Sequence, residues 1–223
     1  MKMSLVRRIR RRLFPPGQAI EGYENEELVD TIFRKTAAYD PKGDWALVSD
    51  IKTVLDFGGG AGLHYKLARR QNPHIRWAVV ETQAMVRRAR ELATDRLKFF
   101  SDVDLAADWL KDVELMHSNG AIQYVANPIE IVRSLCAVRP ATMMWRRVPT
   151  SDGAVEEREV QTSFLSDNGP GSLPTANDKL VRYERHRIPE RPFLSAHQGY
   201  SMTQRSLDPL ERGTEQFRFV RAS

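Results

Sequence analysis

The feature that most constrains the fold is a hydrophobic strand that runs directly into a glycine turn and then into a helix. Residues 52–57 (KTVLDF) read as a buried strand, and residues 58–62 (GGGAG) follow at once. Gly58, Gly60 and Gly62 stand at every second position, and glycine permits both a tight turn and the close approach of a ligand to the backbone. The helix that follows offers free N–H groups at its first turn. The segment therefore predicts a ligand-binding strand–turn–helix unit.

Strand and helix patterns alternate along the rest of the first two thirds of the chain. This rhythm predicts a Rossmann-like doubly wound α/β sheet that is mostly parallel. Residues 200–205 and 216–221 read as two strands joined by a turn-rich segment, so the last strand is expected to be antiparallel. The expected strands before them are 52–57, 75–80, 97–100, 113–117 and 141–148, and the expected helices are 24–39, 62–71, 82–93, 105–111, 128–138 and 189–197.

The length of 223 residues suggests that residues 17–223 form a single domain. The single cysteine, Cys136, excludes an internal disulfide bond. No group of histidine, cysteine and acidic residues has the spacing of a metal site, so no metal is expected. Residues 151–178 contain the turn-forming run DNGPG and few periodic apolar positions, and we expect them to form a lid or loop insertion over the carboxyl ends of the strands. Phe164 and Leu165 should anchor this segment by packing on the domain or the substrate.

The positive charge of the chain is concentrated in its first 16 residues, which hold six basic residues and no acid. Since the whole chain has a formal net charge of +5, the domain itself is close to neutral, and no nucleic-acid partner is expected. On a helix, the tail would place its arginines opposite an apolar stripe, a pattern that suits an anionic membrane surface. We therefore expect a cytoplasmic protein with peripheral contact to the inner membrane surface through residues 1–16. A solvated terminus is the alternative.

Acidic residues follow the neighbouring strands at the edge where ligands bind in such sheets. Asp56 precedes the glycine turn, Glu81 ends the next strand, and Asp102 follows the one after. A dinucleotide-binding loop would have the spacing G-x-G-x-x-G, which places Leu63 at the position of the third glycine. The G-x-G-x-G spacing instead favours S-adenosylmethionine. Asp56 would then fix the turn and meet an ammonium group, Glu81 would accept from ribose hydroxyls, and Asp102 would meet the adenine amino group.

Three segments, VLDFGGGAG, VVET and SNGAIQYVANP, resemble those of class I S-adenosylmethionine-dependent methyltransferases. Together with GYENEELVDTIF they resemble, more narrowly, a little-characterised bacterial methyltransferase family with a DFGGG loop and an LQY-like element. The resemblance covers residues 22–150 and implies a class I methyltransferase fold with S-adenosyl-L-methionine as cofactor. The cofactor-binding residues expected from the spacing and the resemblance are Asp56, Gly58, Gly59, Gly60, Gly62, Glu81, Asp102 and Asn119.

The expected reaction is methyl transfer to a small-molecule or sugar-containing acceptor, in which the enzyme mainly aligns the acceptor with the methyl group. Tyr124 and Arg147 are the residues expected to contact the acceptor. A base can be needed for an oxygen acceptor, but no base is assigned, because His117 is expected to be a core residue. Two alternatives stay open. One is a non-catalytic binding protein with this fold, and the other is a nicotinamide-dependent oxidoreductase.

Overall fold

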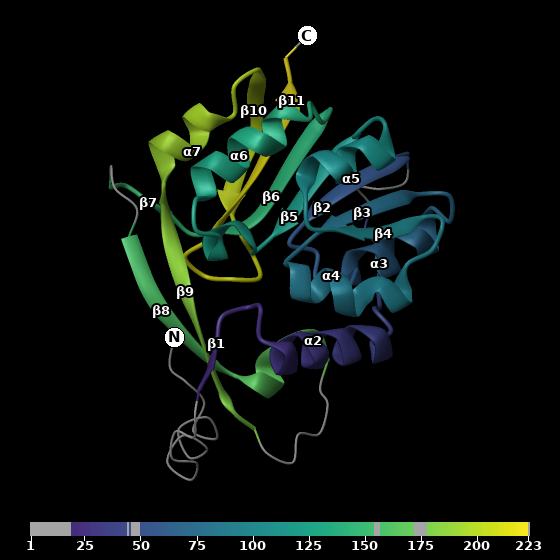
Figure 1. The fold of residues 1–223 in the computed structure, drawn as a ribbon. Helices are drawn as coiled ribbons and strands as arrows, with labels where there is room; N and C mark the ends of the chain where they lie inside the picture. The colour runs from purple at the N-terminus through teal and green to yellow at the C-terminus, as the bar shows by residue number, and fades with distance from the viewer. Residues whose placement is uncertain (1–18, 44, 46–49, 154–156, 172–177, 223) are drawn as a thin grey trace.

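The computed structural model describes residues 19–43, 45, 50–153, 157–171 and 178–222 (Figure 1). Its main sheet has seven strands in the order β10-β11-β6-β5-β2-β3-β4. The strands from β6 to β4 are parallel, and β11 runs antiparallel to both of its neighbours, which confirms the predicted fold class. The bounds are β2 (Thr53–Phe57), β3 (Arg76–Val80), β4 (Leu97–Phe100), β5 (Leu115–Asn119), β6 (Thr142–Val148), β10 (Tyr200–Leu207) and β11 (Glu215–Arg221).

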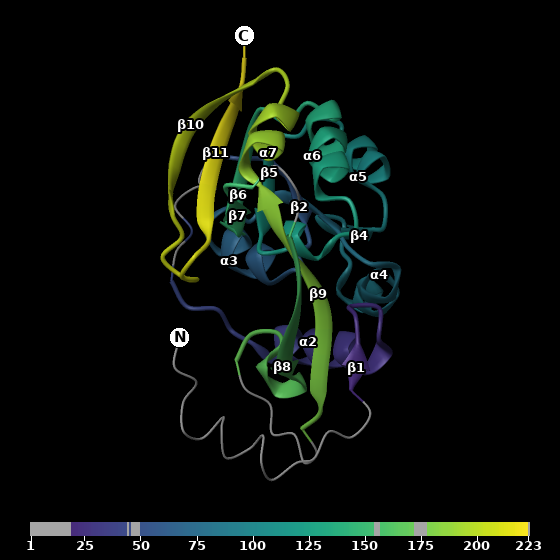
Figure 2. The same cartoon turned by 90° about the vertical axis from the view of Figure 1, so that its left-hand side faces the viewer.

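Helices pack on both faces of this sheet, as a doubly wound fold requires (Figure 2). One core cluster joins α5, α6 and α7 to one face, and a second joins α3 to the opposite face. The short helices α4 and α5 begin at side chains that satisfy free N–H groups; in α4 the Thr82 hydroxyl accepts from the N–H of Met85. The bounds are α3 (Leu63–Gln71), α4 (Gln83–Ala89), η2 (Arg90–Leu92), α5 (Val103–Leu110), η3 (Ile122–Tyr124), α6 (Pro128–Ala137) and α7 (Glu190–Ala196).

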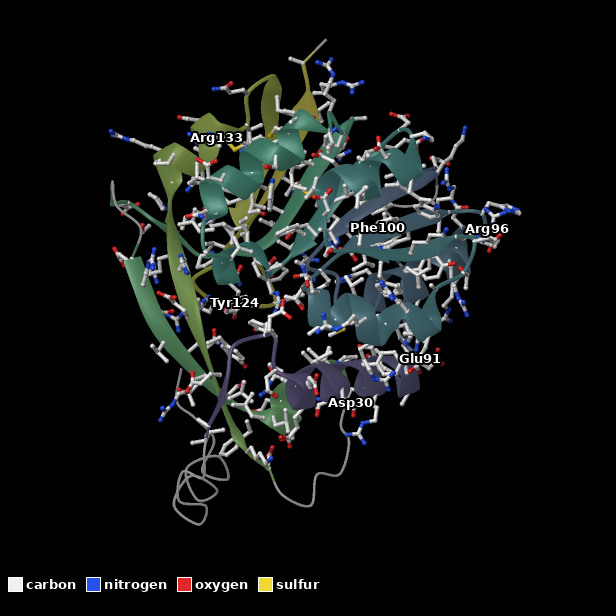
Figure 3. The ribbon with its side chains drawn as sticks, in the orientation of Figure 1. Asp30, Glu91, Arg96, Phe100, Tyr124 and Arg133 are labelled. Atoms are coloured by element: carbon white, nitrogen blue, oxygen red, sulfur yellow. The ribbon has the colours of Figure 1, made fainter. Side chains whose placement is uncertain are left out.

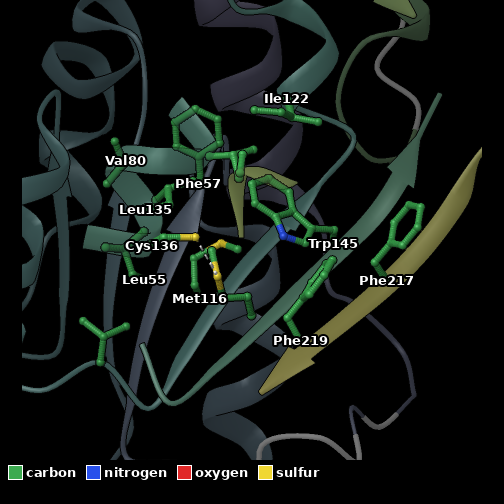
Figure 4. Close-up of a cluster of buried hydrophobic side chains, with 14 of the residues drawn as sticks. Leu55, Phe57, Val80, Met116, Ile122, Leu135, Cys136, Trp145, Phe217 and Phe219 are labelled. Atoms are coloured by element: carbon green, nitrogen blue, oxygen red, sulfur yellow. Dashed lines mark hydrogen bonds between the residues drawn. The ribbon is translucent and has the colours of Figure 1, made fainter. Parts of the chain in front are cut away.

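The largest core cluster lies between the sheet and the helices α5, α6 and α7 (Figure 4). Trp145 of β6 is fully buried in it, and its indole N–H donates to Nε2 of His197 at 2.8 Å. The ring of His197 stacks on Phe219 with centroids 3.7 Å apart. Buried aromatic rings of this kind contribute most of the apolar area that stabilises such a core.

A second, smaller sheet and one helix complete the described fold. The sheet consists of β1 (Ile20–Glu21), β7 (Thr150–Ser151), β8 (Glu157–Phe164) and β9 (Leu180–Pro189). The helix α2 (Glu26–Ala38) lies beside α4. Figures 1 and 2 show β8 and β9 as a long ribbon that reaches from α7 to α2.

Residues 151–178 were expected to form a lid or loop insertion, and the described part of this segment contains a regular strand. Glu157–Phe164 forms β8, which pairs antiparallel with β9 along its whole length, and η4 (Leu165–Asp167) follows. Cross-strand ion pairs support the ribbon, since Arg187 lies 3.6 Å from Glu157 and Arg185 lies 3.4 Å from Glu159. Phe164 and Leu165 are buried, as predicted.

The other expected elements are present, and their ends shift by at most two residues when η2 is counted with α4. The largest of these shifts places β5 at Leu115–Asn119 rather than 113–117, so that Asn119 closes the strand. The basic tail lies outside the described residues, and the single domain stays a prediction. Among the helices described, none combines the length and the apolar character needed to cross a membrane.

Candidate functional site

The glycine turn at the end of β2 is built as the sequence predicted. Gly58, Gly60 and Gly62 have φ angles of 70°, 59° and 83°, a region that residues with a Cβ atom rarely adopt. Gly59 is required for a different reason. A Cβ atom there would lie 2.3 Å from Oδ2 of Asp56, so any side chain would displace the carboxylate. The backbone of the turn is thus packed directly against Asp56.

Asp56 is fully buried beneath the turn. Its Oδ2 accepts from the indole N–H of Trp77 at 3.1 Å, and its Oδ1 lies 2.8 Å from Nδ1 of His117. Burial alone would raise the pKa of Asp56, but the contacts with His117 and His64 lower it well below its ordinary range. The carboxylate supports the turn from below, while its contact with a ligand's ammonium group stays a prediction.

Glu81 holds the turn from the neighbouring strand. Its Oε1 accepts from the backbone N–H of Gly60 at 3.0 Å, and its Oε2 accepts from that of Thr82 at 2.8 Å. Burial raises the pKa of this carboxyl, and the two backbone hydrogen bonds oppose that shift. Each oxygen retains acceptor capacity, and the residue lines the cavity described below. Glu81 can therefore fix the turn and still accept from a ligand.

Asn119 and Arg147 meet at the ends of β5 and β6. Nε of Arg147 donates to Oδ1 of Asn119 at 2.8 Å, and Nη2 donates to the Asn119 carbonyl at 2.9 Å. A Cβ atom on Gly120 would lie 2.4 Å from Nη2, so the guanidinium can lie here only because residue 120 is glycine. Arg147 itself has a φ of 53°, which is unfavourable for a non-glycine residue.

The carboxyl ends of β2, β3, β5 and β6 open into a cavity of about 730 Å³. Gly58, Gly59, Gly60, Glu81 and Asn119 line one side of it. The opposite side is lined mainly by α2, by the segment before it and by β8–β9. Of the predicted residues, Tyr124 and Arg147 also line the cavity, and Figure 3 shows Tyr124 between the main sheet and β9.

Three predicted cofactor residues do not line this cavity, namely Asp56, Gly62 and Asp102. Asp56 is buried beneath the turn, and Gly62 is the last residue of the turn, directly before α3. Asp102 is exposed and caps α5, where its Oδ1 accepts from the N–H of Leu105 at 2.9 Å. The proposed contact of Asp102 with an adenine ring stays a prediction.

Three tyrosines form the aromatic part of the opposite wall. Tyr23 stacks on Tyr183 with ring centroids 4.7 Å apart, and Tyr124 lies 5.1 Å from Tyr23. The hydroxyl of Tyr124 donates to Oε1 of Gln161 at 2.8 Å. Burial raises the pKa of both Tyr23 and Tyr124, so these rings stay uncharged at neutral pH.

The sequence analysis missed Tyr23, Tyr183 and Gln161 as site residues. Tyr23 is part of the segment GYENEELVDTIF, whose residue pattern does not mark it as a cavity residue. A signal for Tyr183 existed, because apolar and charged residues alternate through LVRYERHRI, a period typical of a half-buried strand. Gln161 has no such signal, since its place on the wall follows from the pairing of β8 with β9.

His117 and His197 are buried in the core, as expected for His117. His117 is buried against Asp56, and burial lowers its pKa despite the attraction of that carboxylate. His64 differs, because it lines the cavity near the start of α3, and its Nε2 lies 3.1 Å from Nδ2 of Asn119. No catalytic base is assigned among the described residues.

No family model and no curated protein matches the chain by sequence. Solved structures do match. CalS10, an amino pentose methyltransferase from Micromonospora echinaspora, is 14% identical, with a TM-score of 0.54 over 100% of this chain and 98% of that one. The sugar N-methyltransferase KedS8 from Streptoalloteichus is 16% identical, with a TM-score of 0.52 over 88% of this chain and 87% of that one.

The mitomycin 7-O-methyltransferase MmcR is 15% identical, with a TM-score of 0.50. The match covers 87% of this chain but only 54% of MmcR, so the chain spans about half the length of that protein. Identities this low bear on the fold alone. The strand order, the antiparallel β11 and these matches together show that the chain has the Rossmann-like fold of class I methyltransferases.

Proposed function

We propose that the protein is an S-adenosylmethionine-dependent methyltransferase that acts on a small-molecule or sugar-containing acceptor. The observation that carries the proposal is one cavity with two chemically different sides. One side is the glycine turn with Glu81 and Asn119, and the other is a tyrosine wall with amide and hydroxyl groups. A cofactor and an acceptor could therefore lie side by side in the same space.

The residues on the first side fit an amino acid joined to a nucleoside. The bare backbone of Gly58 to Gly60 leaves room for close approach, and the Glu81 carboxylate faces the cavity with acceptor capacity for ribose hydroxyls. When bound, S-adenosylmethionine supplies an electrophilic methyl group. CalS10 was solved with bound S-adenosylmethionine, and the glycopeptide N-methyltransferase MtfA, which is 13% identical with a TM-score of 0.52, was solved with bound sinefungin.

The residues on the second side fit a sugar or another small polar ring. A sugar has apolar faces and hydroxyl edges, and this wall combines tyrosine rings with the side chains of Gln161, Ser163 and Asn168. Two of the matched proteins are named for sugar substrates, which supports the same class here. The task of the wall is to hold the acceptor atom in line with the methyl group, because orientation supplies much of the rate.

Arg147 adds a charged group to the acceptor side and would favour an acceptor with an anionic or strongly hydrogen-bonding substituent. Its charge is partly balanced, because Nη1 lies 3.8 Å from Oε2 of Glu211. Tyr124 also lies near Glu211, together with the charge of Arg185. Arg147 and Tyr124 are therefore proposed to orient the acceptor, rather than to remove a proton from it.

A nicotinamide-dependent oxidoreductase is the weaker alternative, because Leu63 occupies the position of the third glycine and lines the cavity. Calorimetry with S-adenosylhomocysteine and with NAD separates the two. We expect binding of the first compound with micromolar-range affinity, a typical scale for such ligands. Binding of NAD alone would refute the proposal.

Turnover separates an enzyme from a non-catalytic binding protein. Full-length protein would be incubated with S-adenosylmethionine and a panel of amino sugars, nucleotide sugars and phenols, and mass spectrometry would detect a gain of one methyl group. Arg147→Lys and Tyr124→Phe should lower turnover on any acceptor found, while leaving cofactor binding in place. Cofactor binding without turnover on any acceptor would favour the non-catalytic reading.

A further inference from the structure

A chain of polar contacts runs from the cavity wall to the buried side of the main sheet. Nε of Arg147 donates to Oδ1 of Asn119 at 2.8 Å, and Nδ2 of Asn119 lies 3.1 Å from Nε2 of His64. Nδ1 of His64 lies 3.8 Å from Oδ2 of Asp56, whose Oδ1 lies 2.8 Å from Nδ1 of His117. Five side chains from α3 and three strands are thus connected behind the glycine turn.

The arginine at one end sets the direction of the contacts. A guanidinium has only donors, so the atom of Asn119 that faces Arg147 must be the amide oxygen. The amide nitrogen of Asn119 then faces His64 as a donor, and Nε2 of His64 must accept. With Nε2 as acceptor, the ring proton of His64 lies on Nδ1, which is 3.8 Å from Oδ2 of Asp56 and has no hydrogen-bond partner among the described residues.

The same reasoning argues against a metal centre. Asp56, His64 and His117 offer ligand atoms within 4.8 Å of one another, the residue types of a two-histidine, one-carboxylate site. A metal at Nδ1 of His64 would move the ring proton to Nε2, which would then face the amide N–H₂ of Asn119. Two donors would then oppose each other, so the observed contact between Asn119 and His64 does not fit a metal at Nδ1 of His64.

The groups around His64 act on its proton in opposite directions. Asp56 from β2 attracts a second proton to the ring. His117 from β5, with ring centroids 4.7 Å apart, and Arg147 at the end of β6 oppose it when charged. The indole of Trp45 covers the ring from the segment before β2, with centroids 5.6 Å apart. The side chain of His64 is 21% exposed, so a proton from solvent can reach it.

We propose that His64 is a positioning residue whose neutral form fixes the Asn119 amide and, through it, the Arg147 guanidinium at the acceptor side of the cavity. A protonated ring would donate from Nε2, and Asn119 could accept only by turning its amide over. Its nitrogen would then face Arg147, and that contact would be lost. The significance of Arg147 for an acceptor rests on the proposed function, whereas the coupling itself does not.

The coupling can be tested in the unliganded full chain by nuclear magnetic resonance with isotope-labelled histidine and arginine side chains. At about pH 8 we expect His64 as the Nδ1–H tautomer, and we expect the Arg147 Nε–H signal to be protected from exchange. When the His64 ring takes up a second proton as the pH is lowered, the Arg147 signal should shift and lose protection in step with it. An Nε2–H tautomer, or an Arg147 signal that ignores this titration, would overturn the proposal.

Variants separate positioning from general structural support. In His64→Gln, an amide oxygen can accept from Asn119 without titrating, so protection of Arg147 should persist across the pH range. His74→Gln removes an exposed histidine of the same chain and should retain the wild-type pH response. Loss of the pH response in His74→Gln, or its survival in His64→Gln, would contradict the role of His64.

Binding of S-adenosylhomocysteine gives the functional readout. Because Asn119 is proposed to contact the cofactor, protonation of His64 should weaken wild-type binding of S-adenosylhomocysteine, and the affinity of His64→Gln should depend less on pH. Absence of binding at every pH would refute the proposed function, while the resonance experiment would still decide the coupling. Equal pH profiles for binding in both proteins would show that His64 does not position Asn119.

Discussion

Among single residues, Glu81 shows most clearly how one side chain can serve the fold and the site together. Its two oxygens satisfy the backbone N–H groups of Gly60 and Thr82, and the same carboxylate lines the cavity. A buried N–H group that loses its acceptor costs about 1–3 kcal/mol. Replacement of Glu81 should therefore affect stability as well as ligand binding.

We expect Glu81→Ala to weaken binding of S-adenosylhomocysteine by about 1–3 kcal/mol and to lower the free energy of unfolding by a similar amount. Glu81→Gln keeps one acceptor oxygen for the turn, so it should recover part of the stability but little of the affinity for ribose hydroxyls. Calorimetry and urea unfolding measure the two effects. A stable Glu81→Ala protein with wild-type affinity would remove Glu81 from the site.

At this scale the sequence predicted residues that lie at strand ends, because the end of a parallel strand has a fixed place in the fold. Glu81, Asn119 and Arg147 line the cavity for this reason, whereas Asp102, which was predicted on the same ground, does not line it. The partners of Asp56 could not be predicted in the same way. Its contact with Trp77 depends on the side-by-side register of β2 and β3, which spacing along the chain does not reveal.

Among the elements, the β8–β9 ribbon depends on a small number of buried anchors. Leu165 is 3% exposed and packs in a cluster with Leu28 of α2 and Val181 of β9. Most side chains of β8 are at least partly exposed, so this strand contributes few buried apolar contacts apart from Phe164. The attachment of the cavity wall to α2 should therefore be sensitive to this one leucine.

We expect Leu165→Ala to cost about 2–5 kcal/mol, the usual range for loss of a buried leucine side chain. Hydrogen exchange should accelerate in β8, β9 and α2, while the central strands β2 and β5 stay protected. Val160→Ala on the same ribbon is the matched control, because Val160 is 70% exposed and its loss should change little. Equal exchange in the two variants would show that the ribbon is not anchored through Leu165.

The sequence predicted the main-sheet strands well and missed the ribbon. The reason lies in the composition of β8 and β9, where charged residues alternate with few large apolar ones and glutamate and arginine face each other across the strands. Such strands form because they pair with each other and pack on α2. The alternating pattern of β9 could have revealed that strand, but the pairing that makes β8 a strand is not visible in a local pattern of hydrophobicity.

For the whole molecule, His197 makes the main core sensitive to acid. Its Nε2 accepts from Trp145, and its Nδ1 lies 2.8 Å from the Phe193 carbonyl, so only the neutral ring satisfies both contacts. Burial lowers the pKa of His197 to about 4. In the unfolded chain the ring titrates near its ordinary pKa of about 6.5. The unfolded state therefore takes up the proton first as the pH falls.

The stability that depends on neutral His197 should be fully present above about pH 6.5 and lost as the pH falls toward 4. The predicted loss is about 3 kcal/mol at most, from the difference of the two pKa values. His197→Gln should be less stable at neutral pH but should show a flatter dependence of the free energy of unfolding between these limits. Unfolding in urea at several pH values measures it, and parallel curves for both proteins would refute the assignment.

The basic tail, which lies outside the described residues, gives a prediction about location. Residues 1–16 should attract the chain to anionic membranes, since each basic residue near such a surface contributes about 1 kcal/mol. Full-length protein should sediment with anionic vesicles at low salt and be released at high salt, whereas a chain that lacks residues 1–16 should stay in the supernatant. Equal behaviour of the two chains would leave the tail as a solvated terminus.

The left-handed backbone at Arg147 lowers the stability of the fold at a position whose side chain is proposed to contact the acceptor. A non-glycine residue in this conformation costs about 1–2 kcal/mol, which glycine would relieve. Arg139 has nearly the same conformation, with a φ of 54°, but it is exposed in the turn between α6 and β6. A laboratory selection for thermal tolerance alone should therefore accept glycine at either position. Only Arg139→Gly should yield a protein of higher thermal stability that still binds the proposed acceptor.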